Sequence, residues 1–399
     1  MITEVVNVSI QGRVQDDLPP DIMEIELEED VDQADVFRVR ISIRQKSDGA
    51  WTYVDDERFR VWKPLQIEAG YPDDHDTIVN GYITHVDVIL AQDEGESYLE
   101  ISGMDASCLM DLDDKQLAWA NKKDHEIAET IFASYGLNYE VEDTITPHRE
   151  AVSTILQSET DIQFLRRLAA RNGFECFVKG TTGYFRSPNM QSQPQKILAA
   201  HFGGETNVSS MHVRVDGTPA SLVEIRRIDP MEKQQDAEVL SGSPRRTLGA
   251  RPLATLQSGK ADGRSLLKRQ LAASTQEMKG RLRSGVEGSS RFVTVEGDID
   301  GRAYGAVLRA KRLVTIKGAG ASFSGLYYVT SVRHHFTVED YKQHFKAYRN
   351  GIGLTGDENF GAGFVLPISL PSLALPGAGA SSGNRVLPPQ SQSGSPGGF

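Results

Sequence analysis

Two acidic clusters have the side chains of a cation site. Asp73–Asp76 (Asp-Asp-His-Asp) has the composition of a metal-binding loop but lacks the central glycine and closing glutamate of a calcium loop. Asp298–Gly301 is half a calcium motif, but Arg309 stands where the closing glutamate should be. Both segments are better interpreted as solvated turns, so neither predicts a metal site.

A histidine cluster is the other candidate for chemistry. His334 and His335 are adjacent in a predicted strand, so their side chains face opposite ways and cannot easily share one ion. His344 could face either of them across a hairpin, although a packed strand histidine is the commoner arrangement. The sequence therefore predicts no metal ligands.

Motifs of covalent or nucleotide chemistry are absent from the sequence. There is no G-x-S-x-G, H-E-x-x-H or P-loop, and no paired Cys/His constellation. Carboxylates are abundant, but no pair stands apart as glycoside hydrolysis would need. We predict no catalytic residue and no cofactor, and a protein that is not an enzyme.

Two distant stretches resemble each other. Leu65–Gly70 and Leu313–Gly318 each end in glycine, and each is followed by a turn and by a strand carrying [Ile/Val]-Thr-x-Val, which is Ile83–Val86 in the first copy and Val329–Val332 in the second. A further alternating strand follows in both. This order of features predicts two copies of one β module in the chain.

Alternating apolar and polar residues predict seven short strands in the first part of the chain. They lie at Val5–Val14, Asp21–Leu27, Phe37–Gln45, Trp51–Tyr53, Leu65–Ala69, Tyr82–Leu90 and Tyr98–Ser102. The fold class expected is mainly β with α/β inserts. The predicted domains are a first tube-like β barrel (1–110), an α/β insert (111–195), a second tube-like barrel (196–355) with an inserted helix at about 261–283, and an extension (356–399).

The insert contains two predicted helices. One starts at an Asp124 cap and stops at Gly136, and the other starts near Ser158 and stops at Gly173. Arg166 and Arg167 on the second helix are expected to face outward, as a solvated face or as interface anchors. A hairpin at 174–186 follows.

The extension is rich in Gly, Pro and Ser and has the composition of a disordered tail. Its Leu-Pro steps suit a groove on a partner protein. The interface candidates there are Phe360, Phe364, Leu366 and Leu370.

The bulk composition narrows the class of protein. A formal net charge of −12 disfavours a protein that grips phosphate, so no sequence-specific nucleic acid is expected as a partner. The two cysteines, Cys108 and Cys176, lie far apart, which fits assembly in a reducing cytoplasm. We expect no Sec signal and no membrane span, since no apolar run approaches the ~18 residues that one requires.

Residues 158–174 (SETDIQFLRRLAARNGF) resemble the signature helix of the phage late control gene D family, which includes baseplate hubs and the hub portion of VgrG spike proteins. The segments 65–86, 101–105 and 325–334 also resemble that family in the same order. The resemblance implies two tube-like barrels per chain and a homotrimer with a pseudo-sixfold ring. The chain departs from VgrG in lacking an OB-fold, a β-prism needle and a lysozyme domain, so a separate spike protein is expected.

The function expected from this resemblance is structural. A trimeric hub would join the hexameric inner tube, or a tube-initiator protein, to the trimeric spike, contact neighbouring baseplate proteins and nucleate tube assembly. It would reside in the baseplate of a phage virion or an extracellular injection particle. Two alternatives stay open, a cell-wall hydrolase of the tail tip and a freestanding carbohydrate-binding adhesion protein.

Overall fold

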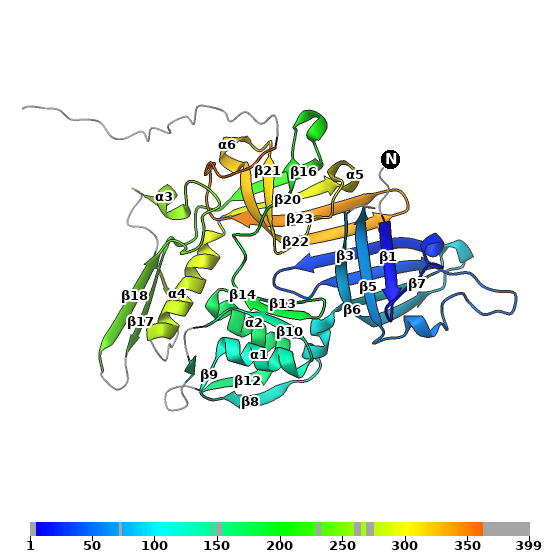
Figure 1. The fold of residues 1–399 in the computed structure, drawn as a ribbon, viewed down its shortest axis with the longest axis horizontal. Coiled ribbons are helices and arrows are strands. Elements are labelled where there is room, and N and C mark those ends of the chain that lie inside the picture. The colour runs from blue at the N-terminus through cyan, green and yellow to red at the C-terminus, as the bar shows by residue number, and fades with distance from the viewer. Residues whose placement is uncertain are drawn as a thin grey trace, which may run out of the picture. The chain divides into compact units, whose positions relative to one another are not determined.

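Antiparallel strands make up most of the computed structural model, which describes residues 5–71, 74–144, 147–148, 154–228, 233–258, 265–268 and 275–361 (Figure 1). The strands are β1 (Val5–Ile10), β2 (Arg13–Val14), β3 (Ile22–Asp30), β4 (Val36–Ser42), β5 (Pro64–Tyr71), β6 (Asp74–Ile89), β7 (Tyr98–Asp105), β8 (Lys115–Trp119), β9 (Lys122–Lys123), β10 (Asn138–Val141), β11 (Pro147–His148), β12 (Ile155–Glu159), β13 (Glu175–Lys179), β14 (Thr182–Arg186), β15 (Gln195–Ala199), β16 (Val208–Val215), β17 (Leu222–Ile228), β18 (Gln235–Ser241), β19 (Ser265–Lys268), β20 (Val293–Asp300), β21 (Leu313–Lys317), β22 (Gly325–Thr337) and β23 (Tyr341–Arg349). The α-helices are α1 (Asp124–Ser134), α2 (Asp161–Asn172), α3 (Leu253–Gln257), α4 (Thr275–Ser290), α5 (Gly301–Tyr304) and α6 (Gly320–Phe323). A mainly β fold with α/β additions is confirmed.

One sheet of thirteen strands runs through both halves of the chain. Its order is β16-β20-β23-β22-β3-β4-β7-β6-β5-β1-β2, with β21 attached to β22 and β15 attached to β21. The link between the halves is the antiparallel pair of β22 with β3. Among the described strands the pairing follows this open path, and no closed barrel appears; the two tandem barrels therefore stay a prediction.

The two halves have the same topology, and we name them by their strands. The N-terminal module consists of β1, β3, β4, β5, β6 and β7, and the C-terminal module of β15, β16, β20, β21, β22 and β23. In each, taken in chain order, the second strand pairs with the third, the third with the sixth, the fourth with the fifth and the fifth with the sixth, all antiparallel. The first strand pairs with the fourth in both, but antiparallel in one module and parallel in the other.

Backbone irregularities fall at equivalent places in the two modules. The register slips at Thr84 in the β6–β7 pair and at Thr330 in the β22–β23 pair. Each threonine hydroxyl donates to a carbonyl across the slip, that of Ser102 at 3.4 Å and that of Lys346 at 3.1 Å. β-Bulges are specific features of a strand pair rather than random defects. Their coincidence confirms that one β unit occurs twice.

Two further coincidences extend the equivalence beyond these strands. Met23 is skipped in the β3–β4 register and Ser209 in the β16–β20 register. Trp62 and Lys311 precede the fourth strand of their modules, and both have a left-handed backbone, with φ of 66° and 65°.

The predicted repeat was aligned correctly in one part and wrongly in another. Ile83–Val86 and Val329–Val332 are equivalent, as expected. Leu65, however, corresponds to Val314 rather than Leu313, because Pro64 pairs with Tyr82 and Leu313 pairs with Tyr328. The shared glycines before these strands are therefore not equivalent positions.

Each module has its own apolar core. Val39, Ile67 and Leu99 lie in the first, which also receives Phe336 and Tyr341 from β22 and β23. The second core is built around residues of β20, β21, β22 and β23. Two cores within one continuous sheet are the arrangement that a duplicated module would give.

The insert between the modules contains α1, α2 and small sheets. β10, β14 and β13 form one sheet, and the pairs β8–β12 and β9–β11 form two others. The predicted hairpin is present as β13–β14, and α2 ends at Gly173 in a left-handed conformation as expected. Asp124 is not a cap, because it is the first residue of α1 and is buried in a pair with Arg171.

A second addition lies between β16 and β20. It contains a sheet of order β18-β17-β19 and the helices α3 and α4. The helix expected over 261–283 differs from the structure, since Ser265–Lys268 is a strand paired with β17 and the helix runs from Thr275 to Ser290.

The segment predicted as the strand Trp51–Tyr53 makes only an isolated bridge from Trp51 to Gln45, and Val5–Val14 is broken by a turn into β1 and β2. Within the described part of the chain, none of the helices has the length and apolar character needed to cross a lipid bilayer.

Candidate functional site

Buried charges lie at the seam where β22 meets β3. Arg309, just before β21, places two of its three guanidinium nitrogens on Glu29 of β3, with Nε at 2.9 Å from Oε2 and Nη2 at 2.8 Å from Oε1. It also pairs with Asp76 of β6. The side chains of Arg309 and Glu29 are 3% and 4% exposed. This bidentate pair connects the second module to two strands of the first.

The electrostatics of Glu29 follow from this contact. Burial by itself would raise the pKa of Glu29, but the charge and hydrogen bonds of Arg309 together with the contact of His334 outweigh burial and hold that pKa well below its usual range. Nε2 of His334 lies 3.6 Å from Glu29 Oε2, and burial lowers the pKa of His334. Glu29 and Arg309 therefore form a buried ion pair beside a neutral imidazole at neutral pH.

A second buried group lies beside the first. Lys311 Nζ is 2.8 Å from Asp35 Oδ1, and the Asp35 amide donates to Asp105 Oδ2 at 2.7 Å. Burial raises the pKa of Asp35 to about 7 despite the Lys311 charge, and burial also raises the pKa of Asp105.

A cavity of about 420 Å³ is lined by Asp35, Asp76 and Asp105 together with residues of β13 and β14. A shifted carboxyl in a cavity is a candidate for catalysis. Here three of the four carboxylate oxygens of Asp35 and Asp105 already have partners, since Asp35 Oδ1 accepts from Lys311 and from the Asp30 amide, and Asp105 accepts from the amides of Asp35 and Ser107. The cluster therefore has a structural role, in which buried groups of the two modules bind each other.

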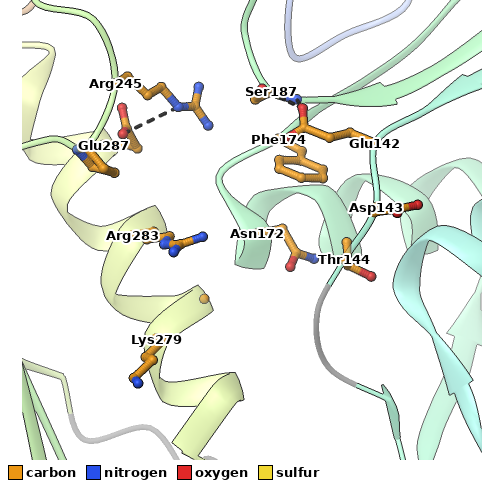
Figure 2. A pocket seen from close by; sticks show the side chains of 12 residues that line it. Glu142, Asp143, Thr144, Asn172, Phe174, Ser187, Arg245, Lys279, Arg283 and Glu287 are labelled. Carbon is orange, nitrogen blue, oxygen red and sulfur yellow. Dashed lines mark hydrogen bonds and ion pairs between the residues drawn. The ribbon is translucent and has the colours of Figure 1, made fainter.

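The largest cavity described, about 600 Å³, lies between α4 and the end of α2 (Figure 2). Lys279 and Arg283 face it from α4, and Asn172, Thr144 and Asp143 lie on the other side. Arg245 Nε is 3.4 Å from Glu287 Oε1, and Ser187 Oγ donates to Glu142 at 2.6 Å. Its charges are of both signs, and Arg245 pairs with Glu287, so it does not select one class of ligand.

The three histidines His334, His335 and His344 do not form a common site. His344 is opposite Arg333, not opposite His334 or His335, and its Nδ1 is 2.8 Å from Asp298 Oδ1. His335 forms a compact group with Glu24 and Glu26, whose ligand atoms lie within 4.8 Å of one another. Both carboxylates already pair with arginines of β4. The group is explained by ion pairing across the sheet.

The turn interpretation of the two acidic segments is wrong for most of their described residues, because Asp74–Asp76 lie in β6, paired with β5, and Asp298–Asp300 lie at the end of β20. Asp300 accepts from the amides of Arg302 and Ala303 and so caps α5. Asp73 lies outside the described residues, and β6 begins at Asp74.

The predicted interface residues lie in different places. Arg167 on α2 is half-exposed and donates to Glu159 and to the Leu156 carbonyl, whereas Arg166 is partly buried and its Nε has no hydrogen-bond partner among the described groups. Phe360 is 6% exposed, so this chain itself covers it. Phe364, Leu366 and Leu370 lie outside the described residues. Their role at an interface stays a prediction.

Sequence comparison gives one family. The model of the Alg8 N-terminal domain matches residues 3–338, which is most of the chain. The chain belongs to the Alg8 N-terminal domain family. No curated protein sequence matches it.

Solved structures with the same fold are tail proteins. The 43 kDa tail protein of prophage MuSo2 from Shewanella oneidensis superimposes with a TM-score of 0.62 at 13% identity, covering 87% of this chain and 99% of that one. A tail protein from Neisseria meningitidis MC58 gives 0.60 at 15% identity, covering 88% and 98%. The E. coli c3393 protein, a component of the type VI secretion system similar to T4 tail proteins gp27 and gp5, gives 0.53 at 12% identity, covering 86% and 76%. This member of the Alg8 N-terminal domain family thus has the fold of phage tail and type VI secretion proteins.

Proposed function

We propose that this chain is a structural baseplate hub of the gene D and VgrG type, a trimer that joins a hexameric inner tube to a trimeric spike and nucleates the tube. The duplicated module carries the proposal. Three chains with two equivalent modules each supply six similar units, which match a sixfold partner on one side while the assembly keeps threefold symmetry. In this proposal residues 1–110 and 196–355 are the two tube-like units, 111–195 the insert and 356–399 an extension.

The fold shared with tail proteins supports this role, and the charged groups support a role without catalysis. In the described cluster of Asp35 and Asp105, three of the four carboxylate oxygens accept hydrogen bonds from backbone amides or from Lys311. No observation on the described residues favours a peptidoglycan hydrolase or a freestanding adhesion protein.

The direct test is the mass of the purified chain and its behaviour toward tube protein. Light scattering is expected to give three times the mass of the chain, and electron microscopy is expected to show tubes starting from it when purified tube protein is added. The control omits the hub. A monomer that leaves tube assembly unchanged would overturn the proposal, and clearing of a peptidoglycan zymogram would favour the hydrolase instead.

We also propose that the extension contacts the spike or a neighbouring baseplate protein. A chain truncated after residue 361 keeps the whole described fold, including the buried Phe360. Truncation is therefore expected to leave the oligomer intact and to reduce spike retention in a pull-down. Unchanged retention would remove this role from the extension.

A further inference from the structure

The equivalence of the modules predicts a contact that a single chain cannot make. Within the chain, β22 pairs antiparallel with β3 over seven residue pairs, from Ser331 opposite Asp30 to Thr337 opposite Glu24. The N-terminal equivalent of β22 is β6, and the C-terminal equivalent of β3 is β16. Applying the same contact between chains puts β6 of one copy against β16 of another.

Both strand edges are free in the described part of the chain. β16 pairs only with β20 and ends the sheet. β6 pairs with β5 as far as Tyr82 and with β7 on its other side, and beyond Ile83 no strand covers its outer edge. An uncovered strand edge is a template for pairing with another chain.

Apolar exposure confirms that these edges lack a neighbour. Val88 and Leu90 are 41% and 57% exposed, whereas their equivalents in β22, His334 and Phe336, are 0% and 7% exposed because β3 covers them. On the other edge Val215 is 43% exposed. Val88, Leu90 and Val215 thus stand in solvent at positions whose equivalents the intramolecular contact buries, whereas Val213 and Met211 of β16 are partly buried against the second core.

We propose that β6 pairs antiparallel with β16 of a second copy of this chain, in the register of the β22–β3 pair. Val86 then lies opposite Val215, Val88 opposite Val213 and Leu90 opposite Met211. Asp87 lies opposite Arg214 on the other face. The contact is head-to-tail, which builds a ring when the rotation between copies closes; that closure and the number of copies rest on the proposed function.

Charge complementarity supports this register. In the intramolecular pair Arg333 of β22 donates to Glu28 of β3 at 2.9 Å. At the equivalent rung the signs are exchanged, with Asp87 on β6 and Arg214 on β16. Both side chains are exposed, and neither forms an ion pair with a described residue.

The same exchange of sign occurs within the modules. Arg38 of β4 pairs with Glu26 of β3, whereas at the equivalent rung Glu296 of β20 lies 3.3 Å from His212 of β16. Charge order along this face of the sheet is therefore inverted between modules as a whole. A slip of one residue would place Asp87 against an apolar residue and turn the valines outward.

Disulfide crosslinking tests the register. In Val88→Cys/Val213→Cys the two thiols lie opposite each other, so oxidation is expected to join chains into dimers and trimers on a non-reducing gel. The matched control is Val88→Cys/Arg214→Cys, in which the second thiol is one residue away and on the other face, and little crosslinking is expected. Cys108 and Cys176 are buried and leave the background low.

Charge reversal is the second test. Asp87→Arg and Arg214→Asp each place like charges opposite one another and are expected to weaken association by about two- to fivefold per contact. The double variant Asp87→Arg/Arg214→Asp is expected to restore it. Asp87 and Arg214 are both exposed, and melting curves establish that each variant is folded.

Three outcomes separate the two proposals. In-register crosslinking with charge-swap rescue supports the β6–β16 pair. A trimer that nucleates tubes but crosslinks equally in both cysteine variants, or is indifferent to charge reversal, overturns the pairing and leaves the proposed function standing. A monomer that forms no crosslink overturns both.

Discussion

Removing the guanidinium at the seam is the most informative perturbation of this fold. Arg309→Met keeps an unbranched side chain in place of the aliphatic part of arginine but leaves Glu29, which is 4% exposed, without its counter-ion. Breaking a buried pair from one side typically lowers the free energy of unfolding by about 3–5 kcal/mol, because one charge stays buried and uncompensated. The matched control is Arg333→Met on the same seam, whose pair with Glu28 is 56% and 35% exposed. An exposed pair contributes about 0–1 kcal/mol, so this control is expected to be nearly neutral.

Urea unfolding followed by far-UV circular dichroism measures both variants. The double variant Arg309→Met/Glu29→Gln removes the orphaned charge and is expected to recover part of the loss. Equal stability of Arg309→Met and Arg333→Met would refute the view that buried charge at the seam holds the modules together.

The pH dependence gives an independent check on the same residue. In the wild type Arg309 lowers the pKa of Glu29, so the stability from this group is present above its unfolded pKa and is lost as pH falls. Without Arg309, burial alone raises that pKa, and the group's contribution is lost as pH rises. Arg309→Met is therefore expected to gain more stability than the wild type between pH 7 and pH 5, and the double variant to lose this extra slope.

Three other predictions concern a buried carboxyl group, the two β-bulges and a glycine packed against a backbone carbonyl. The pKa of Asp35 is raised to about 7, so its contribution is present at low pH and lost as pH rises through 7; Asp35→Asn is expected to flatten the stability profile between pH 4 and pH 8, and an unchanged slope in urea titrations would contradict this assignment. Thr330→Val removes the 3.1 Å hydrogen bond across its bulge and is expected to lower the free energy of unfolding by about 0.5–1 kcal/mol; Thr84→Val removes the 3.4 Å bond across its bulge and the 2.9 Å contact of its hydroxyl with His85 Nδ1 and is expected to lose a similar amount, and unchanged stability of either variant in urea titrations would argue against this account. Gly318→Ala is expected to lose at least about 2 kcal/mol, since φ is 89° and a Cβ would lie 1.7 Å from the Ala200 carbonyl oxygen, while Gly204→Ala, with no atom within 4 Å, should change stability by less than about 0.5 kcal/mol in thermal melts.

Local signals in the sequence located the elements that depend on neighbouring residues. Gly173 ends α2 because the chain needs a left-handed residue there, and that requirement is visible in the sequence. The [Ile/Val]-Thr-x-Val segments were found as a pair because the bulge imposes the same threonine twice. The strand before each was misaligned by one residue, because all five residues of β21 are buried and its sequence therefore gives no period-two pattern to align with β5.

Contacts between residues far apart in the chain could not be predicted from the sequence in the same way. Asp124 was assigned to a cap because aspartate favours that position, but its contact with Arg171 wins in the folded chain. In the sequence Arg309 stands out only as the residue that replaces the closing glutamate of a calcium motif, although in the structure it forms the buried ion pair where β22 meets β3. Its partner Glu29 is 280 residues away. The available signal was an arginine inside the apolar run Val307–Ala310, which burial can tolerate only beside an acid.

The connection between the second and third strands differs greatly in length between the two modules, and this difference has a consequence for an assembly of several chains. β3 and β4 are joined by residues 31–35, whereas β16 and β20 are joined by residues 216–292, and yet the rungs of both pairs keep the same slip. Lengthening a tip adds little closure entropy, because that cost grows only with the logarithm of loop length. In the proposed ring the N-terminal and C-terminal modules alternate, so the segment inserted between β16 and β20 would occur on every second module. A single gene product would thereby distinguish alternate positions of a nearly uniform ring, and a partner protein could bind at those positions alone.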